Sequence, residues 1–268
     1  DASIDSPSSN LTSSFSGHVA PVDSSGNGQA NIIFAADTGG RVWRFDINPA
    51  SKDRTDFAQT HLIADISSGS GSGNRRFFNE VDVVYRKNEK DILLSIGSGY
   101  RAHPLSLSVT DYHFVIRTTI TKPNTTHVID MDDLNNWGTG SAYGWKIPLT
   151  YPGEKVLSRS STTSGAILFT TFAPKSNNAA DLCSSDPGIA TLYILNDNII
   201  HPINLVQGGI PTMPVIVSNK RSNDTGSTTS SKSILIGTEV VNIKKGGTGP
   251  KLGNGYDNVK KDYWLESK

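Results

Sequence analysis

Six histidines are the residues of this chain best suited to bind zinc or to transfer protons near neutral pH. The HExxH and H-x-H patterns place two imidazoles close together, and neither pattern occurs in the sequence. We therefore expect the histidines to be surface or packing residues. They are His18, His61, His103, His113, His127 and His201.

Three carboxylates cluster at Asp130, Asp132 and Asp133. Oxygen ligands in such a group suit a hard cation such as Ca²⁺. The same spacing suits a turn, because aspartate side chains accept hydrogen bonds from backbone N–H groups two or three residues further on. A turn leading into Leu134 and Trp137 is the preferred interpretation, with a cation site as the alternative.

A single cysteine, Cys183, excludes an internal disulfide, a cysteine-based zinc site and a CxxC redox pair. An inert thiol, a disulfide to a cysteine outside this chain and a nucleophile stay open, in that order of preference. No G-x-S-x-G elbow, Walker loop or GxGxxG strand–helix unit is present. GSGYR, residues 97–101, lacks the helix and lysine of a phosphate loop, so it is expected to be a turn between strands.

The charges balance, with 25 Lys and Arg against 25 Asp and Glu. No net field attracts nucleic acid or an anionic membrane surface, so both partners are disfavoured, and no nucleic-acid partner is expected. No apolar run reaches the roughly 18 residues of a membrane span. The first residues, DASIDSPSSN, contain neither an initiator methionine nor an apolar signal core, so we expect a fragment of a longer protein.

The elements that must position these residues are β-strands. Helical periodicity is nearly absent, whereas short β-branched and aromatic runs bounded by Gly, Asn, Asp and Pro recur along the chain. The expected strands fall into four sets. They are 18–22, 31–36, 41–47 and 61–66; 81–85, 91–97, 112–119 and 127–131; 155–161, 166–172, 191–197 and 201–206; and 213–218, 233–240 and 262–266.

In each set the second strand is the most apolar, as expected for an inner strand covered on both faces. Four-stranded units in series are typical of propeller blades, so the expected class is an all-β propeller of about four blades. A β-sandwich is the alternative architecture. The polar linkers 67–74, 222–231 and 246–255 separate no regions of different composition, so the whole chain, 1–268, is expected to be one domain or part of one.

The stretch AADTGGRVWRFDI, residues 35–47, predicts a hairpin. Gly39 and Gly40 allow the positive φ angles of a tight turn, and Asp37 can accept hydrogen bonds from backbone N–H groups of that turn. Side chains alternate along the second strand, so Trp43 and Phe45 share one face. We expect Asp37 to anchor the turn and Trp43 to pack against a neighbouring blade.

Seven phrases stand out along the chain: AADTGGRVWRFDIN, RRFFNEVDVVY, ILLSIGSGYRAHPL, GEKVLS, ILFTTFAP, TLYILN and YWLE. In this order they resemble the C-terminal domain of the PilC/PilY family, large proteins associated with the tips of type IV pili. The resemblance extends from about Val19 to Glu266. SIGSGYRAHPL is the most distinctive. The resemblance implies a propeller similar to those of quinoprotein enzymes, with this chain as roughly its C-terminal half and upstream domains before it.

The resemblance also implies a calcium loop. The family pattern D-x-D-x-D-x-x-x-D has the alternate spacing of an EF-hand loop. Three of its four carboxylates are replaced here by a hydroxyl or an amide, so one negative charge is left to offset the dehydration of the ion. A weak or lost calcium site and a turn satisfied by its own backbone are the two interpretations. The corresponding positions are Asp23, Ser25, Asn27, the Gln29 carbonyl and Asn31.

For function, the resemblance implies a non-enzymatic extracellular protein at the pilus tip or the bacterial outer membrane surface. It would act in adhesion, pilus biogenesis and the regulation of pilus extension and retraction. Its partners would be minor pilins or the pilus tip, and a host or surface receptor. The alternatives are a quinoprotein dehydrogenase that holds pyrroloquinoline quinone over calcium, and a purely structural extracellular propeller.

Overall fold

The structure is a computed structural model of the 268-residue chain. It describes residues 11–53, 56–86, 89–121, 127–163, 165–175, 187–196, 198–222, 228–243 and 259–263. Cys183 lies outside these residues. The described chain contains β-strands and one short 3₁₀ helix, η2 (Gly71–Gly73), so the expected all-β class is confirmed. No membrane-spanning helix is found in the part of the chain that the structure describes.

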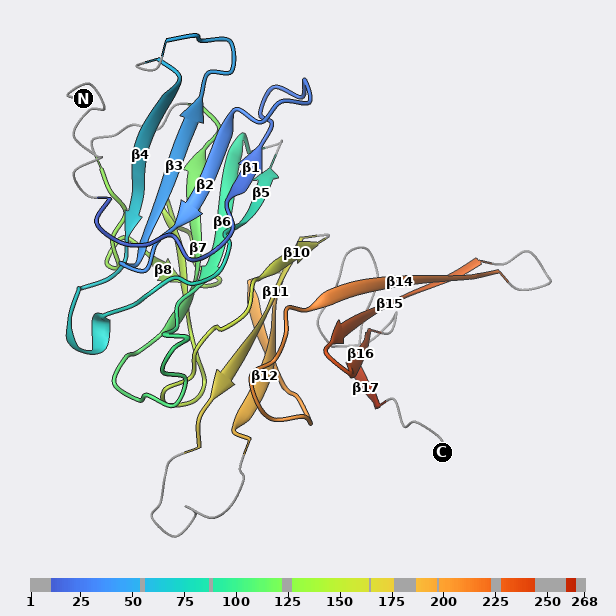
Figure 1. The fold of residues 1–268 in the computed structure, drawn as a ribbon. Coiled ribbons are helices and arrows are strands. Elements are labelled where there is room, and N and C mark those ends of the chain that lie inside the picture. Colours follow the sequence, from blue (N-terminus) through green and yellow to red (C-terminus); the bar gives the residue numbers. More distant parts are fainter. Residues whose placement is uncertain are drawn as a thin grey trace. The chain divides into compact units, whose positions relative to one another are not determined.

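The strands belong to two compact units, Asp1–Arg159 and Ser160–Lys268. The first unit contains two sheets (Figure 1). One has the order β1-β2-β3-β4 and consists of β1 (Ala20–Val22), β2 (Ile32–Ala36), β3 (Arg41–Ile47) and β4 (Ala58–Asp65). The other has the order β5-β6-β7-β9-β8 and consists of β5 (Asp82–Arg86), β6 (Asp91–Gly97), β7 (Tyr112–Thr119), β9 (Gly144–Pro148) and β8 (Asn135–Asn136).

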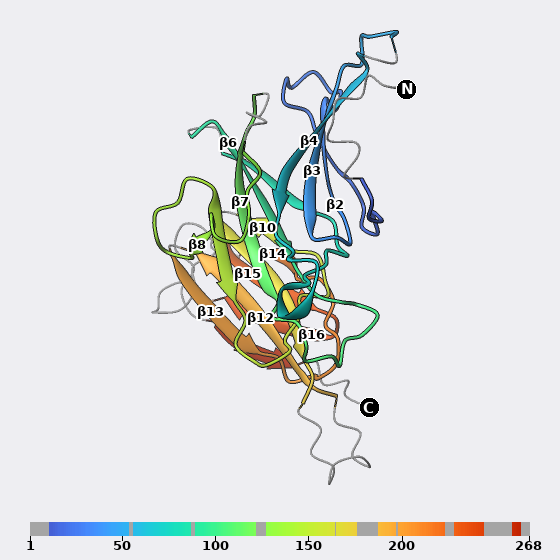
Figure 2. The same ribbon diagram turned by 90° about the vertical axis from the view of Figure 1, so that its left-hand side faces the viewer.

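These two sheets lie against each other and share one hydrophobic core, as the views in Figures 1 and 2 agree. Phe34 and Val42 enter it from the first sheet, and Ile92, Leu94 and Phe114 enter it from the second. All five side chains are fully buried. Burial of this apolar surface is the main favourable term that holds the first unit together.

The second unit repeats the arrangement with two antiparallel four-stranded sheets. Leu168 and Leu192 from one sheet and Ile234 and Val241 from the other belong to a second buried core. The strands are β10 (Ser161–Thr163), β11 (Ala166–Ala173), β12 (Ile189–Asn196) and β13 (Ile199–Asn204), followed by β14 (Val215–Ser222), β15 (Thr228–Ile236), β16 (Glu239–Ile243) and β17 (Val259–Tyr263).

Strands β3, β6 and β7 have the bounds that the sequence predicts, and three of the four sheets have four strands. Two sheets that face each other across one core occur both in stacked propeller blades and in sandwiches, so the propeller stays a prediction. The single domain also stays a prediction, because each of the two compact units has its own core.

Three expected strands differ from the structure by more than a shift of their ends. Residues 233–240 do not form one strand, because Gly237 adopts φ +59° and a turn separates β15 from β16. Within 127–131, Ile129 forms only an isolated bridge to Ala64. Residues 155–160 are outside the named strands, and Val156 instead bonds Ser98 across the loop that follows β6.

Candidate functional site

Asp37 lies at the turn between β2 and β3 and is fully buried. Its Oδ1 accepts hydrogen bonds from the backbone N–H groups of Gly39 (2.8 Å) and Arg41 (3.1 Å), and its Oδ2 accepts one from Trp43 Nε1 (2.9 Å). The prediction that Asp37 anchors this turn is confirmed. Of the two glycines, Gly40 adopts the left-handed conformation, with φ +82°.

Trp43 lies on the opposite face of β3 from the shared core. The register pairs Val42 with Ala36 and Trp43 with Ala35, and only Val42 and Ala36 belong to the core of the two sheets. The prediction that Trp43 packs against the neighbouring sheet is therefore wrong for the sheet within this unit. Val42 takes that place, because alternate side chains of a strand point to opposite faces.

The loop 23–31 is closed by hydrogen bonds within itself. The Asp23 carboxylate accepts bonds from the backbone N–H groups of Ser25 (3.1 Å), Gly26 (2.7 Å) and Gly28 (2.6 Å). The Gly28 bond is the largest cause that lowers the pKa of Asp23. Two amide oxygens are used in the same way, since Asn27 Oδ1 accepts from Gln29 N and Asn31 Oδ1 accepts from Ser24 N.

A calcium ion would therefore compete with these backbone donors for the only carboxylate of the loop. The described residues contain no group of three or more His, Cys, Asp or Glu arranged to hold a metal ion. The donor set fits a self-satisfied turn better than it fits Ca²⁺, which takes six to eight oxygens. Calcium binding by this loop stays a prediction.

The acidic cluster is a turn, as the sequence predicts. Asp130 Oδ1 accepts hydrogen bonds from the backbone N–H groups of Asp132 (2.8 Å) and Asp133 (3.2 Å). Asp133 Oδ2 accepts one from Asp130 N (2.9 Å) and lies 2.9 Å from His127 Nε2. The carboxylates thus cap the turn that leads into Leu134, whose side chain is buried.

Three of the phrases that resemble the pilus family meet in space after β6. Gly99 N donates to the Arg76 carbonyl (3.0 Å), Val156 N donates to the Ser98 carbonyl (3.0 Å), and Arg101 Nη1 donates to the Leu157 carbonyl (2.9 Å). A Cβ atom at Gly97 would lie 2.2 Å from Val156 Cβ. The glycine is needed because the two chain segments approach too closely for any side chain.

Aromatic contacts hold the same loop. Phe78 and Tyr100 stack at 5.8 Å, the Arg76 guanidinium lies 4.5 Å from the centre of the Tyr100 ring, and His103 packs against that ring from another side. A cavity of about 490 Å³ lies beside Arg76, Tyr100 and His103. Since Arg76 already makes a cation–π contact, these residues primarily fix the loop.

Two buried charged residues lie under this loop, and no sequence pattern predicts either of them. Burial raises the pKa of Asp111, whose Oδ1 accepts a hydrogen bond from Ser98 Oγ (2.7 Å). Burial lowers the pKa of Lys155, whose ammonium donates to the carbonyls of Ser106 and Gly153. Each charge favours the ionised form of the other, which offsets part of the cost of burying both.

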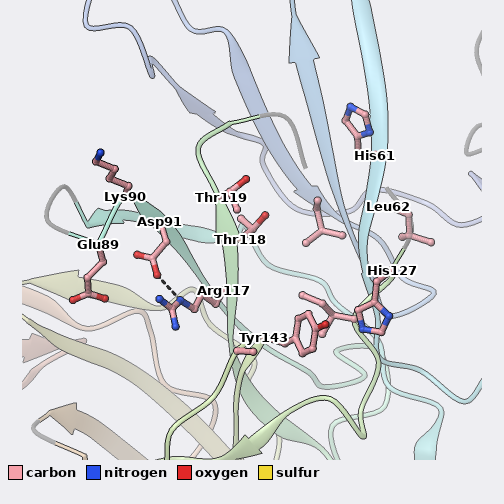
Figure 3. Close-up of a pocket in the computed structure, with 13 residues that line it drawn as sticks. His61, Leu62, Glu89, Lys90, Asp91, Arg117, Thr118, Thr119, His127 and Tyr143 are labelled. Carbon is pink, nitrogen blue, oxygen red and sulfur yellow. Dashed lines mark hydrogen bonds and ion pairs between the residues drawn. The ribbon is translucent and has the colours of Figure 1, made fainter. Parts of the chain in front are cut away.

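A second pocket, here called the Tyr143 pocket, has a volume of about 440 Å³ and lies within the first unit (Figure 3). It is lined by β4, by the start of β6, by the end of β7 and by parts of the segments 127–129 and 142–143. Beside it, the buried Arg44 of β3 donates to the carbonyls of Thr119 (2.7 Å) and Thr121 (3.0 Å). This clamp ties the first sheet to the end of β7.

One side of the Tyr143 pocket carries an ion-pair network. Asp91 accepts hydrogen bonds from Arg86 Nε (2.8 Å) and Arg117 Nε (2.5 Å), and Figure 3 shows the contact with Arg117. Burial alone would raise the pKa of Asp91, but the bonds from the two arginines outweigh it and lower the pKa. Glu89 pairs with Arg86 in the same network.

The other side of the pocket is aromatic. The rings of His127 and Tyr143 are neighbours in Figure 3. Their centroids lie 4.8 Å apart, and 39% of Tyr143 is exposed. The sequence predicts His127 only as a surface or packing residue, and it does not single out Tyr143, Asp91 or Arg117. These residues come from segments far apart in the chain, so no local spacing could have brought them together.

No family model matches the sequence, and no curated protein matches it. Among solved structures, the chain is similar to the Pseudomonas aeruginosa PilY1 C-terminal domain, with 13% identity and a TM-score of 0.54. The match covers 83% of this chain and 59% of that one, so the chain spans little more than half of the length of that domain. Over most of its length, this chain therefore has a fold similar to that of the PilY1 C-terminal domain, which agrees with the family resemblance carried by its motifs.

Proposed function

We propose that this chain is part of a type IV pilus protein that acts without enzymatic chemistry. The observation that carries the proposal is the agreement between motif order and fold: AADTGGRVW, SIGSGYRAHPL and GEKVLS follow the family order, and the fold is similar to that of the PilY1 C-terminal domain. In this role the rigid sheets present loops to partners at the bacterial surface. The partners we propose are minor pilins at the pilus tip and a host or abiotic surface receptor.

The test is an in-frame deletion of the complete gene, with the wild-type gene restored in trans as control. We expect fewer surface pili, weaker attachment and reduced twitching motility, each recovered on complementation. Unchanged pilus number, attachment and motility would contradict the proposal. Oxidation of alcohols or sugars by the purified full-length protein, seen only with added pyrroloquinoline quinone, would favour the dehydrogenase alternative.

A further inference from the structure

The Tyr143 pocket offers hydrogen-bond donors that the protein does not use. Its two carboxylates, Glu89 and Asp91, are occupied by Arg86 and Arg117. Arg117 bonds Asp91 through Nε and the Ser141 carbonyl through Nη1 (3.2 Å), while its Nη2 has no hydrogen-bond partner among the described residues. An incoming acceptor can therefore bind Arg117 without displacing an existing contact.

The charged residues that line the pocket are two cations, Lys90 and Arg117, and two carboxylates, Glu89 and Asp91. Both carboxylates are already paired, because Arg86, outside the lining, contacts each of them and Arg117 contacts Asp91. Lys90 is exposed and forms no ion pair within the described part of the chain. A partly enclosed site with a lysine that forms no ion pair among the described residues and a free guanidinium N–H favours an anionic oxygen ligand, because charge-assisted hydrogen bonds are the stronger ones.

The aromatic side of the pocket favours a ring that has both an apolar face and polar edges. Tyr143 and His127 form an exposed pair of rings against which C–H groups can pack. Thr118 also lines the pocket and supplies a hydroxyl group. The volume of about 440 Å³ lies in the range of small-ligand sites, ~300–1,000 Å³.

We propose that the Tyr143 pocket binds an acidic sugar, a pyranose that carries a carboxylate. The carboxylate lies on Arg117 and the apolar face of the ring lies on Tyr143. That a glycan of a host or abiotic surface is the source of this sugar rests on the proposed function. The choice of an anionic, hydroxyl-rich ring rests on the pocket alone.

An acidic protein segment is the less favoured occupant. An extended segment can bind by adding a strand to a free sheet edge. Here the edge of β4 beside the pocket is already occupied, because Ile129 N donates to the Ile63 carbonyl (3.0 Å) and Asp65 N donates to the Ile129 carbonyl (2.9 Å). The remaining opening suits a compact ligand.

The test compares methyl β-D-glucuronide with methyl β-D-glucoside, which differ at the carboxylate, in titrations of the purified wild-type protein followed by ligand-observed NMR. We expect the glucuronide to bind about tenfold more tightly, and this preference to weaken in high salt. The methyl glycoside of N-acetylneuraminic acid is a second acidic probe. If neither acidic sugar binds more tightly than the glucoside, the proposal is wrong.

Variants locate the binding. Tyr143→Ala is expected to weaken glucuronide binding about tenfold, and Arg117→Gln or Lys90→Gln to reduce the preference for the acid over the glucoside. Tyr85→Ala and Lys52→Gln are matched controls, because both residues are exposed and neither lines the pocket. Thermal unfolding checks that each variant is folded, and Lys90→Gln alters no internal contact among the described residues.

Two further outcomes would overturn the proposal: wild-type affinity in Tyr143→Ala, or an acidic hexapeptide that binds the pocket more tightly than the sugars do. These titrations involve no pili. Sugar binding by a protein whose gene deletion leaves pili unchanged would refute the proposed function alone. A clear pilus phenotype without sugar binding would refute this inference alone.

Discussion

Asp37 is the residue on which the β2–β3 hairpin depends most directly, because one buried carboxylate accepts bonds from two backbone N–H groups and from the Trp43 indole. In Asp37→Asn the side-chain NH₂ group would take the place of the oxygen that accepts from the Trp43 indole. Two hydrogen-bond donors would then face each other. We expect the free energy of unfolding to fall by about 2–3 kcal/mol in urea denaturation. Trp43→Phe is the matched control and should cost less by itself. Equal stability of Asp37→Asn and wild type would mean that the carboxylate is not the anchor.

His113 of β7 is a buried group whose titration is linked to folding. It lies 2.8 Å from Ser95 Oγ, and burial lowers its pKa from the ordinary value of 6.5 to about 3. Between these two values the unfolded chain binds a proton that the folded chain excludes, so stability falls as the pH falls below about 6.5. From pH 7.5 to pH 5 we expect a loss of about 2 kcal/mol from this group.

The measurement is urea denaturation at both pH values, with His113→Gln as the variant that cannot titrate. The pH dependence of the free energy of unfolding is compared between the wild type and His113→Gln, and the difference is the contribution of His113. Asp111 is present in both proteins, and its raised pKa makes the fold more stable, not less, as the pH falls. Identical pH dependence in the two proteins would show that His113 does not contribute.

At the scale of elements, β6 and the segment around Val156 approach so closely that Gly97 has no room for a methyl group. Gly97→Ala is expected to cost about 1–3 kcal/mol by overpacking. Val156→Ala in the same chain should relieve part of this cost, so the double variant is more stable than the sum of the two single changes predicts. Gly140→Ala is the control, since a Cβ there meets no atom within 4 Å. Additive costs in denaturation would show that the two residues do not press on each other.

The loop 23–31 is the element that decides the calcium question. Since Asp23 already accepts three backbone N–H bonds, we expect the unfolding midpoint to be unchanged between millimolar CaCl₂ and EDTA. A calcium-dependent rise of several degrees that Asp23→Ala abolishes would instead establish the weak site that the family pattern implies.

For the whole molecule, each compact unit has its own hydrophobic core, which predicts that the units unfold with separate transitions. Phe114→Ala in the first core and Leu168→Ala in the second should each reduce the free energy of unfolding of one unit by about 2–5 kcal/mol. The calorimetric transition of that unit should move to a lower temperature, and the other transition should stay in place. A single transition that both variants shift equally would show that the chain unfolds as one domain.

The sequence by itself determined the features that depend on neighbouring residues. Apolar, β-branched and aromatic runs bounded by turn residues set the bounds of β3, β6 and β7, and aspartate side chains set the turns at Asp37 and at Asp130–Asp133. Motif order also led to a fold similar to that of the PilY1 C-terminal domain. These features were readable because strand alternation and turn hydrogen bonds act over two to four residues.

Only the tertiary structure decided which faces pack together and which side chains meet. It placed Val42 rather than Trp43 in the shared core, buried Arg44 under the end of β7, and brought His127 and Tyr143 into the pocket that also holds Asp91 and Arg117. A strand's own sequence specifies that it has two faces but not which face another sheet will cover. That choice is made by the packing of residues distant in the chain, whose spacing leaves no periodic trace.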